Sequence, residues 1–331
     1  MAVRRRKQRR GRSYAWRYRG RIVACVFVEV LIICALVIMV GWNKGVKEWF
    51  EQFEQPVLKE MDISGINSPN AILMHARGGK VLGEINGDEK IYPASMTKIM
   101  TVILGIENFD DLDEKITLTN EMFSGLYEQD ATQAGFQPGE EVRVIDLLYG
   151  AMLPSGAECC IALADTISGS EADFAELMNK KARKLGMENT HFCDSTGLHN
   201  PDHYSTVKDI AVLMKYCIKN DTFREIVETS RHSTGVTNIH PDGITYYSTM
   251  FKNLSDSTVT GGKILGGKTG YTSEAGHCLV SFAEIEGREY IFVSAGASGA
   301  DGNTIPHIQD AVTVYNRVGA AIEAKMNDNN K

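Results

Sequence analysis

A long apolar run near the N-terminus is the feature that most constrains this chain. It extends from Ile22 to Trp42, and Glu29 is its only charged residue. Twenty-one helical residues reach about 30 Å, the thickness of the hydrocarbon core of a bilayer. No small-residue cleavage site follows, so we interpret residues 22–42 as one uncleaved transmembrane helix rather than a signal peptide. A near-neutral carboxyl or a local water defect would accommodate Glu29, and pairing with a partner helix is the alternative.

The charge distribution predicts the orientation of this helix. Residues 1–21 contain ten Lys and Arg and no acidic residue, whereas the remaining 310 residues contain 25 basic and 42 acidic residues. A basic tail alone would suggest nucleic acid, but a basic segment directly before an apolar run indicates a cytoplasmic tail instead. We therefore expect a lipid membrane and no nucleic acid as partners, with the acidic bulk exported.

The exported part is predicted to contain a stalk over 43–62, one domain over 63–325 and a disordered tail over 326–331. Helical patterns in the middle with strand patterns at both ends indicate an α+β domain built on an antiparallel sheet. The predicted strands cover 71–75, 80–85, 263–269, 277–285 and 290–297. The predicted helices cover 99–106, 142–152, 155–167, 170–186, a segment opening at 206, and 305–325.

No metal or cofactor is predicted. Cys159 and Cys160 are neighbours in an apolar run, which favours buried thiols, and no Cys-x-x-Cys pair suggests structural zinc. Glu188 and His191 offer two metal ligands, but catalytic zinc normally needs three from the protein. A packed or capping role for His191 is the simpler interpretation.

Ser95 and Lys98 form an S-x-x-K pattern before the apolar stretch Ile99–Ile106. Helical positions three apart share a face, so the lysine can reach the serine hydroxyl. Serine is a weak nucleophile until a base takes its proton, and lysine is a base only when burial or a nearby cation lowers its pKa. The alternative is a helix N-cap at Ser95. A second copy, Ser205–Lys208, lies beside a capping threonine and is interpreted as structural.

Two further motifs are candidates for the same site. Lys268-Thr-Gly270 follows two glycines, which let a ligand approach a strand closely, and its alternative is a glycine-rich turn with an exposed lysine. Ser155-Gly-Ala157 follows a proline. Its structural interpretation is strong, because Ser155 and Glu158 match a capping box before an apolar helix.

In chain order, the three motifs match those of the penicillin-recognising serine enzymes. Longer segments resemble the serine D-Ala-D-Ala carboxypeptidases of the low-molecular-weight penicillin-binding proteins (peptidase S11-like). These segments are Ala71–Met74, Tyr92–Lys98, Leu153–Gly156, Leu185–Phe192, Thr196–Leu198, His203–Thr206 and Gly267–Gly270. The resemblance runs from about residue 64 to 320. It implies the β-lactamase/penicillin-binding transpeptidase-like fold, an antiparallel sheet with a helical subdomain.

The resemblance also implies a function. Such enzymes remove the terminal D-alanine from peptidoglycan stem pentapeptides, act in cell-wall synthesis and cell shape, use no cofactor and are inhibited by β-lactam antibiotics. The implied roles are Ser95 as nucleophile, Lys98 as base, Ser155 as proton relay, Lys268, Thr269 and Gly270 as the carboxylate-binding motif, and the backbone N–H groups of Ser95 and Tyr271 as the oxyanion hole. Repulsion between Lys98 and Lys268 would help to keep Lys98 neutral.

Two departures from the family pattern affect these expectations. Ala157 stands where the family usually has Asn, and the missing amide hydrogen bond would cost about 0.5–1.5 kcal/mol. Many relatives also carry a C-terminal β domain and a C-terminal membrane anchor, whereas this chain ends soon after its last predicted helix. We therefore expect slower chemistry, or a substitute side chain, and a different position relative to the cell wall.

The leading hypothesis is a single-pass protein of a bacterial cell membrane, with a cytoplasmic N-terminus and an extracytoplasmic D,D-carboxypeptidase domain. The alternatives are a D,D-endopeptidase and a catalytically weak penicillin-binding or sensing module. A β-lactamase ranks low, because no acidic loop between Ser155 and Lys268 suggests a base for fast deacylation.

Overall fold

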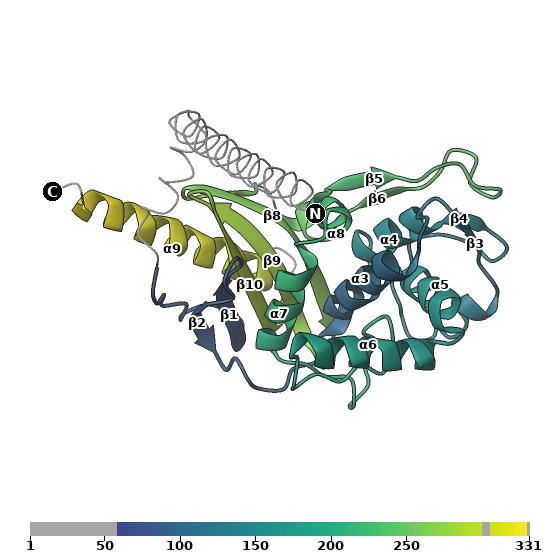
Figure 1. The fold of residues 1–331 in the computed structure, drawn as a ribbon, viewed down its shortest axis with the longest axis horizontal. Coiled ribbons are helices and arrows are strands. Elements are labelled where there is room, and N and C mark those ends of the chain that lie inside the picture. Colours follow the sequence, from purple (N-terminus) through teal and green to yellow (C-terminus); the bar gives the residue numbers. More distant parts are fainter. Residues whose placement is uncertain (1–57, 255, 300–304, 330–331) are drawn as a thin grey trace, which may run out of the picture. The chain divides into compact units, whose positions relative to one another are not determined.

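The computed structural model describes residues 58–254, 256–299 and 305–329 (Figure 1). The predicted cytoplasmic tail, transmembrane helix and most of the stalk lie outside these residues. Within the described ranges, no helix is both long enough and apolar enough to cross a membrane. The chain divides into two units, and the fold described below is that of the second, Val57–Lys331.

A six-stranded antiparallel sheet with the order β2-β1-β10-β9-β8-β7 organises this unit. The strands are β1 (Asn70–His75), β2 (Val81–Ile85), β7 (Thr258–Val259), β8 (Gly262–Thr272), β9 (Gly276–Ile285) and β10 (Arg288–Ala297). The five strands predicted from the sequence are confirmed. The sixth strand, β7, was not predicted, because two residues are too short to show the alternation of apolar and polar residues typical of a strand.

Alternation along the strands gives each face of the sheet its own apolar core. Leu73 and Phe292 point to one face, where they pack with Val314 of α9 (Pro306–Asn329). Their neighbours Ile72 and Val293 point to the other face, where the remaining helices cover them. Burial on both faces explains why the central positions of β9 and β10 are mostly apolar.

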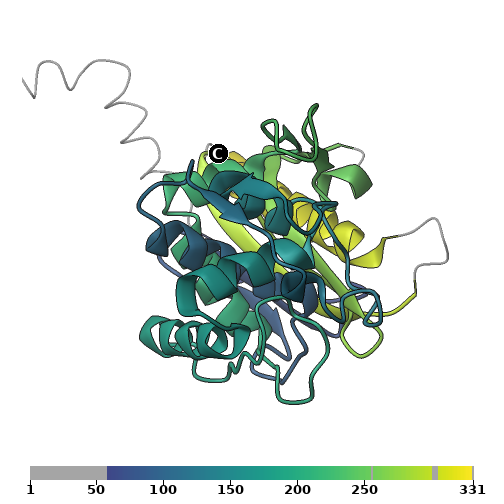
Figure 2. The ribbon, with the colours of Figure 1, turned by 90° about the vertical axis from the view of Figure 1, so that its right-hand side faces the viewer.

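Helices α3 to α8 lie on the second face or beside it (Figures 1 and 2). They are α3 (Lys98–Asn108), α4 (Val144–Met152), α5 (Ala157–Ser168), α6 (Glu171–Leu185), α7 (Val207–Cys217) and α8 (Asp221–Glu228). Two small ladders accompany them: β3 (Lys115–Thr117) with β4 (Glu141–Arg143), and β5 (Arg231–Ser233) with β6 (Thr245–Tyr247). Single 3₁₀ turns are η1 (Ala94–Thr97), η2 (Glu121–Phe123) and η3 (Phe251–Asn253). The predicted α+β class is confirmed.

Two predicted helix caps are confirmed in detail. The Ser170 hydroxyl accepts the Asp173 N–H at 3.1 Å and opens α6, which ends at Gly186 with a left-handed φ of 81°. The Thr206 hydroxyl accepts the Asp209 N–H at 3.0 Å and opens α7. Both satisfy N–H groups that the helix itself leaves without a partner.

Three predicted boundaries were wrong. The helix expected from 142 begins at Val144, because Glu141–Arg143 pair with β3 instead. The helix expected from Ser155 begins at Ala157, because Ser155 has a left-handed φ of 74° that a helix cannot include. The closing helix continues past Lys325 to Asn329, since no glycine or proline stops it. As predicted, Cys159 and Cys160 are buried free thiols.

Candidate active site

Ser95 and Lys98 meet where η1 runs into α3. Pro93 precedes the turn, and Ala94 adopts a left-handed φ of 47°, which is costly for a residue with a side chain. Ser95 therefore lies inside a 3₁₀ turn, and the alternative of a helix N-cap was wrong. The Lys98 Nζ donates a hydrogen bond to the Ser95 Oγ at 3.0 Å. The S-x-x-K spacing has thus brought the two side chains into contact.

Ser155 joins this pair from the loop before α5. Its φ is 74°, and its Oγ donates to the Ser95 Oγ at 3.0 Å. The predicted capping box was wrong, because this backbone conformation turns the hydroxyl to Ser95 and leaves Gly156 as the N-cap. The carboxylate of Glu158 instead accepts backbone N–H groups of a neighbouring loop, at Ala134 and Gly135.

Lys268 and Thr269 approach from β8. The Lys268 Nζ, with the residue 1% exposed, donates to the Ser155 Oγ at 3.0 Å and to the Thr269 carbonyl at 2.9 Å. The Thr269 hydroxyl lies 2.7 Å from that of Thr249. One chain of hydrogen bonds therefore links Lys98, Ser95, Ser155 and Lys268, four residues that the sequence assigned to one site.

Gly270 lets β8 pass close to Ser95. A Cβ at this position would lie 2.9 Å from the Ser95 nitrogen, so only glycine permits the approach. Tyr271, the next residue, is 60% exposed. β7 pairs with β8 only at Gly262 and Lys263. On that edge, no strand in the described part of the chain pairs with 266–272, so backbone groups there can bind an extended peptide.

Burial is the main cause of the unusual electrostatics of the two lysines. It lowers the pKa of Lys98, which is 3% exposed, against the opposing effect of nearby acidic groups that include Asp194. Burial also lowers the pKa of Lys268 well below its ordinary value, and the charge of Lys98 lowers it further. The sequence predicted that repulsion by Lys268 would lower the pKa of Lys98, but burial is the cause there, and the repulsion acts on Lys268 instead.

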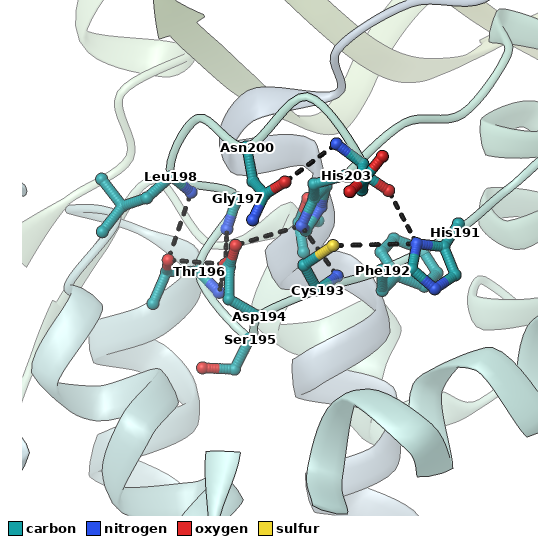
Figure 3. Close-up of polar contacts among 12 residues, drawn as sticks. His191, Phe192, Cys193, Asp194, Ser195, Thr196, Gly197, Leu198, Asn200 and His203 are labelled. Carbon is teal, nitrogen blue, oxygen red and sulfur yellow. Dashed lines mark hydrogen bonds and ion pairs between the residues drawn. The ribbon is translucent and has the colours of Figure 1, made fainter. Parts of the chain in front are cut away.

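A network of polar contacts holds the loop that contains Asp194 and His203 (Figure 3). The Thr196 carbonyl accepts a hydrogen bond from the Lys98 Nζ at 2.6 Å. The Asp194 carboxylate in turn accepts the N–H groups of Thr196 and Gly197, at 2.7 and 2.6 Å. Its other oxygen lies 3.1 Å from the Nδ1 of His203, whose Nε2 is 2.9 Å from the hydroxyl of Thr97 in η1.

This network also sets the pKa of Asp194. Burial raises it, but His203 and the Thr196 and Gly197 donors outweigh burial and hold it at about 2. The sequence assigned no role to these residues, although Thr196–Leu198 and His203–Thr206 were among the segments that resembled the family. The signal was therefore present, but Thr196 acts through its backbone carbonyl, which no side-chain pattern reveals.

Within residues 58–254, 256–299 and 305–329, no three His, Cys, Asp or Glu side chains are placed to hold a metal ion. The His191 Nδ1 lies 2.7 Å from the carbonyl of Asp202, within its own loop. The contacts around Ser95 are made by hydroxyls, amines and backbone groups.

A sequence model of the peptidase S11 family, D-alanyl-D-alanine carboxypeptidase, matches residues 57–299, which include every residue of this site. The chain belongs to the peptidase S11 family. The D-alanyl-D-alanine carboxypeptidase DacF of Bacillus subtilis is 36% identical over 231 residues, covering 69% of this chain and 57% of the relative. DacC of Escherichia coli is 36% identical over 251 residues, covering 68% and 56%.

The S11 fold is found in solved structures as well. A substituted form of the Streptomyces K15 DD-transpeptidase matches with a TM-score of 0.70 and 31% identity, covering 77% of this chain and 98% of that one. The β-lactamase/penicillin-binding fold implied by the resemblance is therefore confirmed. The chain spans a little over half the length of DacF and DacC, so those matches concern the S11 domain rather than the whole relatives.

Proposed function

We propose that the chain is a membrane-anchored serine D,D-carboxypeptidase that removes the terminal D-alanine from peptidoglycan stem pentapeptides and is inhibited by β-lactams. The observation that carries the proposal is the hydrogen-bond chain from Lys98 through Ser95 and Ser155 to Lys268. It joins a buried amine, a hydroxyl, a second hydroxyl and a second amine, and acyl transfer through a serine ester needs such a hydroxyl with a base beside it.

The acylation step follows from these contacts. Lys98, whose uncharged form burial favours, accepts the proton of the Ser95 Oγ as that oxygen bonds to the carbonyl carbon of the penultimate D-alanine. The negative charge that develops on the carbonyl oxygen faces the N–H groups of Ser95 and Tyr271. Each donor of such an oxyanion hole contributes about 3–4 kcal/mol in serine hydrolases. Ser155 then relays the proton held by Lys98 to the leaving nitrogen as the C–N bond breaks.

Deacylation reuses the same groups. Water gives a proton to Lys98 as it attacks the ester carbonyl, and the Ser95 Oγ takes that proton back when the ester bond breaks. The terminal carboxylate of the substrate pairs with Lys268 and the hydroxyl of Thr269, which favours the charged form of Lys268 while substrate is bound. The free edge of β8 binds the peptide backbone.

Ala157 is the residue that favours the weaker alternative. It is buried in the first turn of α5 and brings no amide to the site. A lost hydrogen bond of about 0.5–1.5 kcal/mol slows a reaction by about two- to twelvefold. That reduction leaves a working enzyme, so we rank the penicillin-binding or sensing module second.

Membrane anchoring is supported by the apolar run Ile22–Trp42 and the ten basic residues before it. We expect the chain in the membrane fraction, its S11 domain accessible to protease added outside spheroplasts, and deletion of 1–42 to release it. Recovery of the full chain in the soluble fraction would contradict the anchor.

Mass spectrometry of the penicillin adduct, together with D-alanine release from diacetyl-Lys-D-Ala-D-Ala, tests the chemistry. We expect an adduct on Ser95 and D-alanine release, both lost in Ser95→Ala. Ser205→Ala, in the second S-x-x-K copy, is the matched control and keeps both. A stable adduct without peptide cleavage would support the sensing module, and rapid penicillin turnover a β-lactamase. Preferred cleavage of cross-linked muropeptides would support an endopeptidase.

A further inference from the structure

Glu274 lies in the turn between β8 and β9, a few residues beyond the Lys268-Thr-Gly motif. The turn is fixed locally, because the Thr272 hydroxyl accepts the N–H of Ala275 at 3.0 Å. The side chain of Glu274 is 47% exposed, and its Oε2 lies 3.9 Å from the Nδ1 of His199. That separation is too long for a hydrogen bond, so His199 leaves both carboxylate oxygens able to accept one.

The surroundings of His199 place Glu274 beside the nucleophile. The His199 ring packs edge-on against Tyr92, with ring centroids 4.8 Å apart, and Tyr92 is three residues before Ser95. Gly197, two residues before His199, packs so tightly that a Cβ there would collide with the carbonyl of Ala94. The carboxylate of Glu274 therefore lies on the side of the sheet that carries Ser95.

Two stacked histidines lie on the opposite face of the same turn. His277, at the start of β9, stacks on His307 of α9 with ring planes 4° apart and centroids 5.0 Å apart. Because α9 covers the face away from Ser95, this pair marks the side that Glu274 avoids. The turn thus separates a histidine stack on one face from a single carboxylate on the other.

The direction of a bound substrate follows from the proposed roles of the β8 residues. The terminal carboxylate lies at Lys268 and Thr269, and the scissile carbonyl lies at Ser95, beside Gly270. The rest of the peptide therefore continues along β8 toward Thr272. With about 3.3 Å per extended residue, the residue before D-Ala-D-Ala lies about 7 Å from the carboxyl-terminal one. That distance places it beyond Gly270, toward the turn that carries Glu274, so a long side chain directed to the Ser95 side of the sheet can reach the carboxylate.

We propose that Glu274 determines specificity by binding a free ammonium group at the end of the side chain that precedes D-Ala-D-Ala. The inference rests on the proposed function, because it takes the substrate direction from it. An amine on a flexible four-carbon stem carries a compact charge that suits an exposed carboxylate. Acylation of that amine, as in a cross-linked peptide, removes the charge. The site therefore favours stem peptides that have not been cross-linked through this amine.

The test compares two peptides on the full chain: acetyl-Lys-D-Ala-D-Ala, with a free side-chain amine, and its diacetyl form, without one. We expect kcat/KM to favour the free amine about two- to fivefold at low salt, as for an exposed ion pair, and the preference to shrink in high salt. Glu274→Gln brings the ratio close to one, and Glu274→Lys reverses it. Glu284→Gln is the matched control, since Glu284 pairs with Lys263 at the far end of β8 and β9.

The outcomes separate this inference from the proposed function. Cleavage of both peptides at equal rates, or a preference that survives in Glu274→Gln, overturns the role of Glu274 and leaves the carboxypeptidase proposal intact. Cleavage of neither peptide overturns the carboxypeptidase proposal and this inference with it. A preference lost in Glu284→Gln as well as in Glu274→Gln shows a general effect of net charge, and also overturns the inference.

Discussion

Asp194→Asn removes the charge at the centre of the buried network behind Lys98. Burial raises the pKa of Asp194, but His203 and the donors of Thr196 and Gly197 lower it from 3.8 to about 2. Each pKa unit corresponds to about 1.4 kcal/mol, so ionisation of this carboxyl stabilises the folded state by about 2 kcal/mol. Because folding lowers the pKa, the stabilisation is complete above pH 3.8 and is lost as the pH falls toward 2.

Urea unfolding of the full chain, followed by circular dichroism, measures this loss. We expect Asp194→Asn to be about 2 kcal/mol less stable than the wild type at pH 7, and the difference to shrink below pH 4. Penicillin acylation should also slow, because the Thr196 carbonyl that binds Lys98 loses its support. Asp202→Asn, on the exposed part of the same loop, is the matched control, with an expected effect of about 0.5 kcal/mol or less. The reasoning fails if both variants have the same stability at pH 7, or if the loss persists unchanged at pH 2.

Three further predictions concern the site and its frame. Burial lowers the pKa of Lys98, and the proposed mechanism uses its neutral amine as the base, so the penicillin acylation rate should fall as the pH drops through that pKa; a rate that rises on acidification would contradict this role. Gly197→Ala should lower the thermal stability of the domain more than Gly169→Ala does. Both glycines have φ near 80°, where an alanine loses about 1–2 kcal/mol, but only an alanine at 197 would also collide with the carbonyl of Ala94. Equal losses would refute the collision. Ser170→Ala should lower the free energy of unfolding by about 1 kcal/mol, because α6 loses its N-cap, and it should leave penicillin labelling unchanged. An unchanged free energy of unfolding would show that the cap contributes nothing.

Local patterns predicted the frame of the domain well. The hydroxyls of Ser170 and Thr206 cap their helices as expected, since a cap depends on residues only three apart. Short apolar runs beside the turn residues 286–288 located β9 and β10 in the same local way. The start of α4 was missed because Glu141–Arg143 join a ladder with Lys115–Thr117, and that pairing is not local.

Ser155 shows where local reasoning fails. Ser155 and Glu158 have the spacing of a capping box, yet the hydroxyl binds Ser95 and the carboxylate binds the loop at Ala134. Both partners are distant in sequence, and Ser155 holds a left-handed backbone that no propensity favours. Only the order of three motifs along the chain linked Ser155 to Lys98 and Lys268. The support from Asp194 could not be found in this way, because it reaches Lys98 through a backbone carbonyl.

The pairing of β1 with β10 also determines when the domain can be completed. Ala71 lies opposite Ser294, so a strand made early has no partner on that edge until nearly all of the domain has been synthesised. Contacts between such distant residues slow folding, and an unpaired apolar strand can bind other chains in the meantime. The nascent chain therefore passes through a long period in which the helices can form but the sheet cannot close.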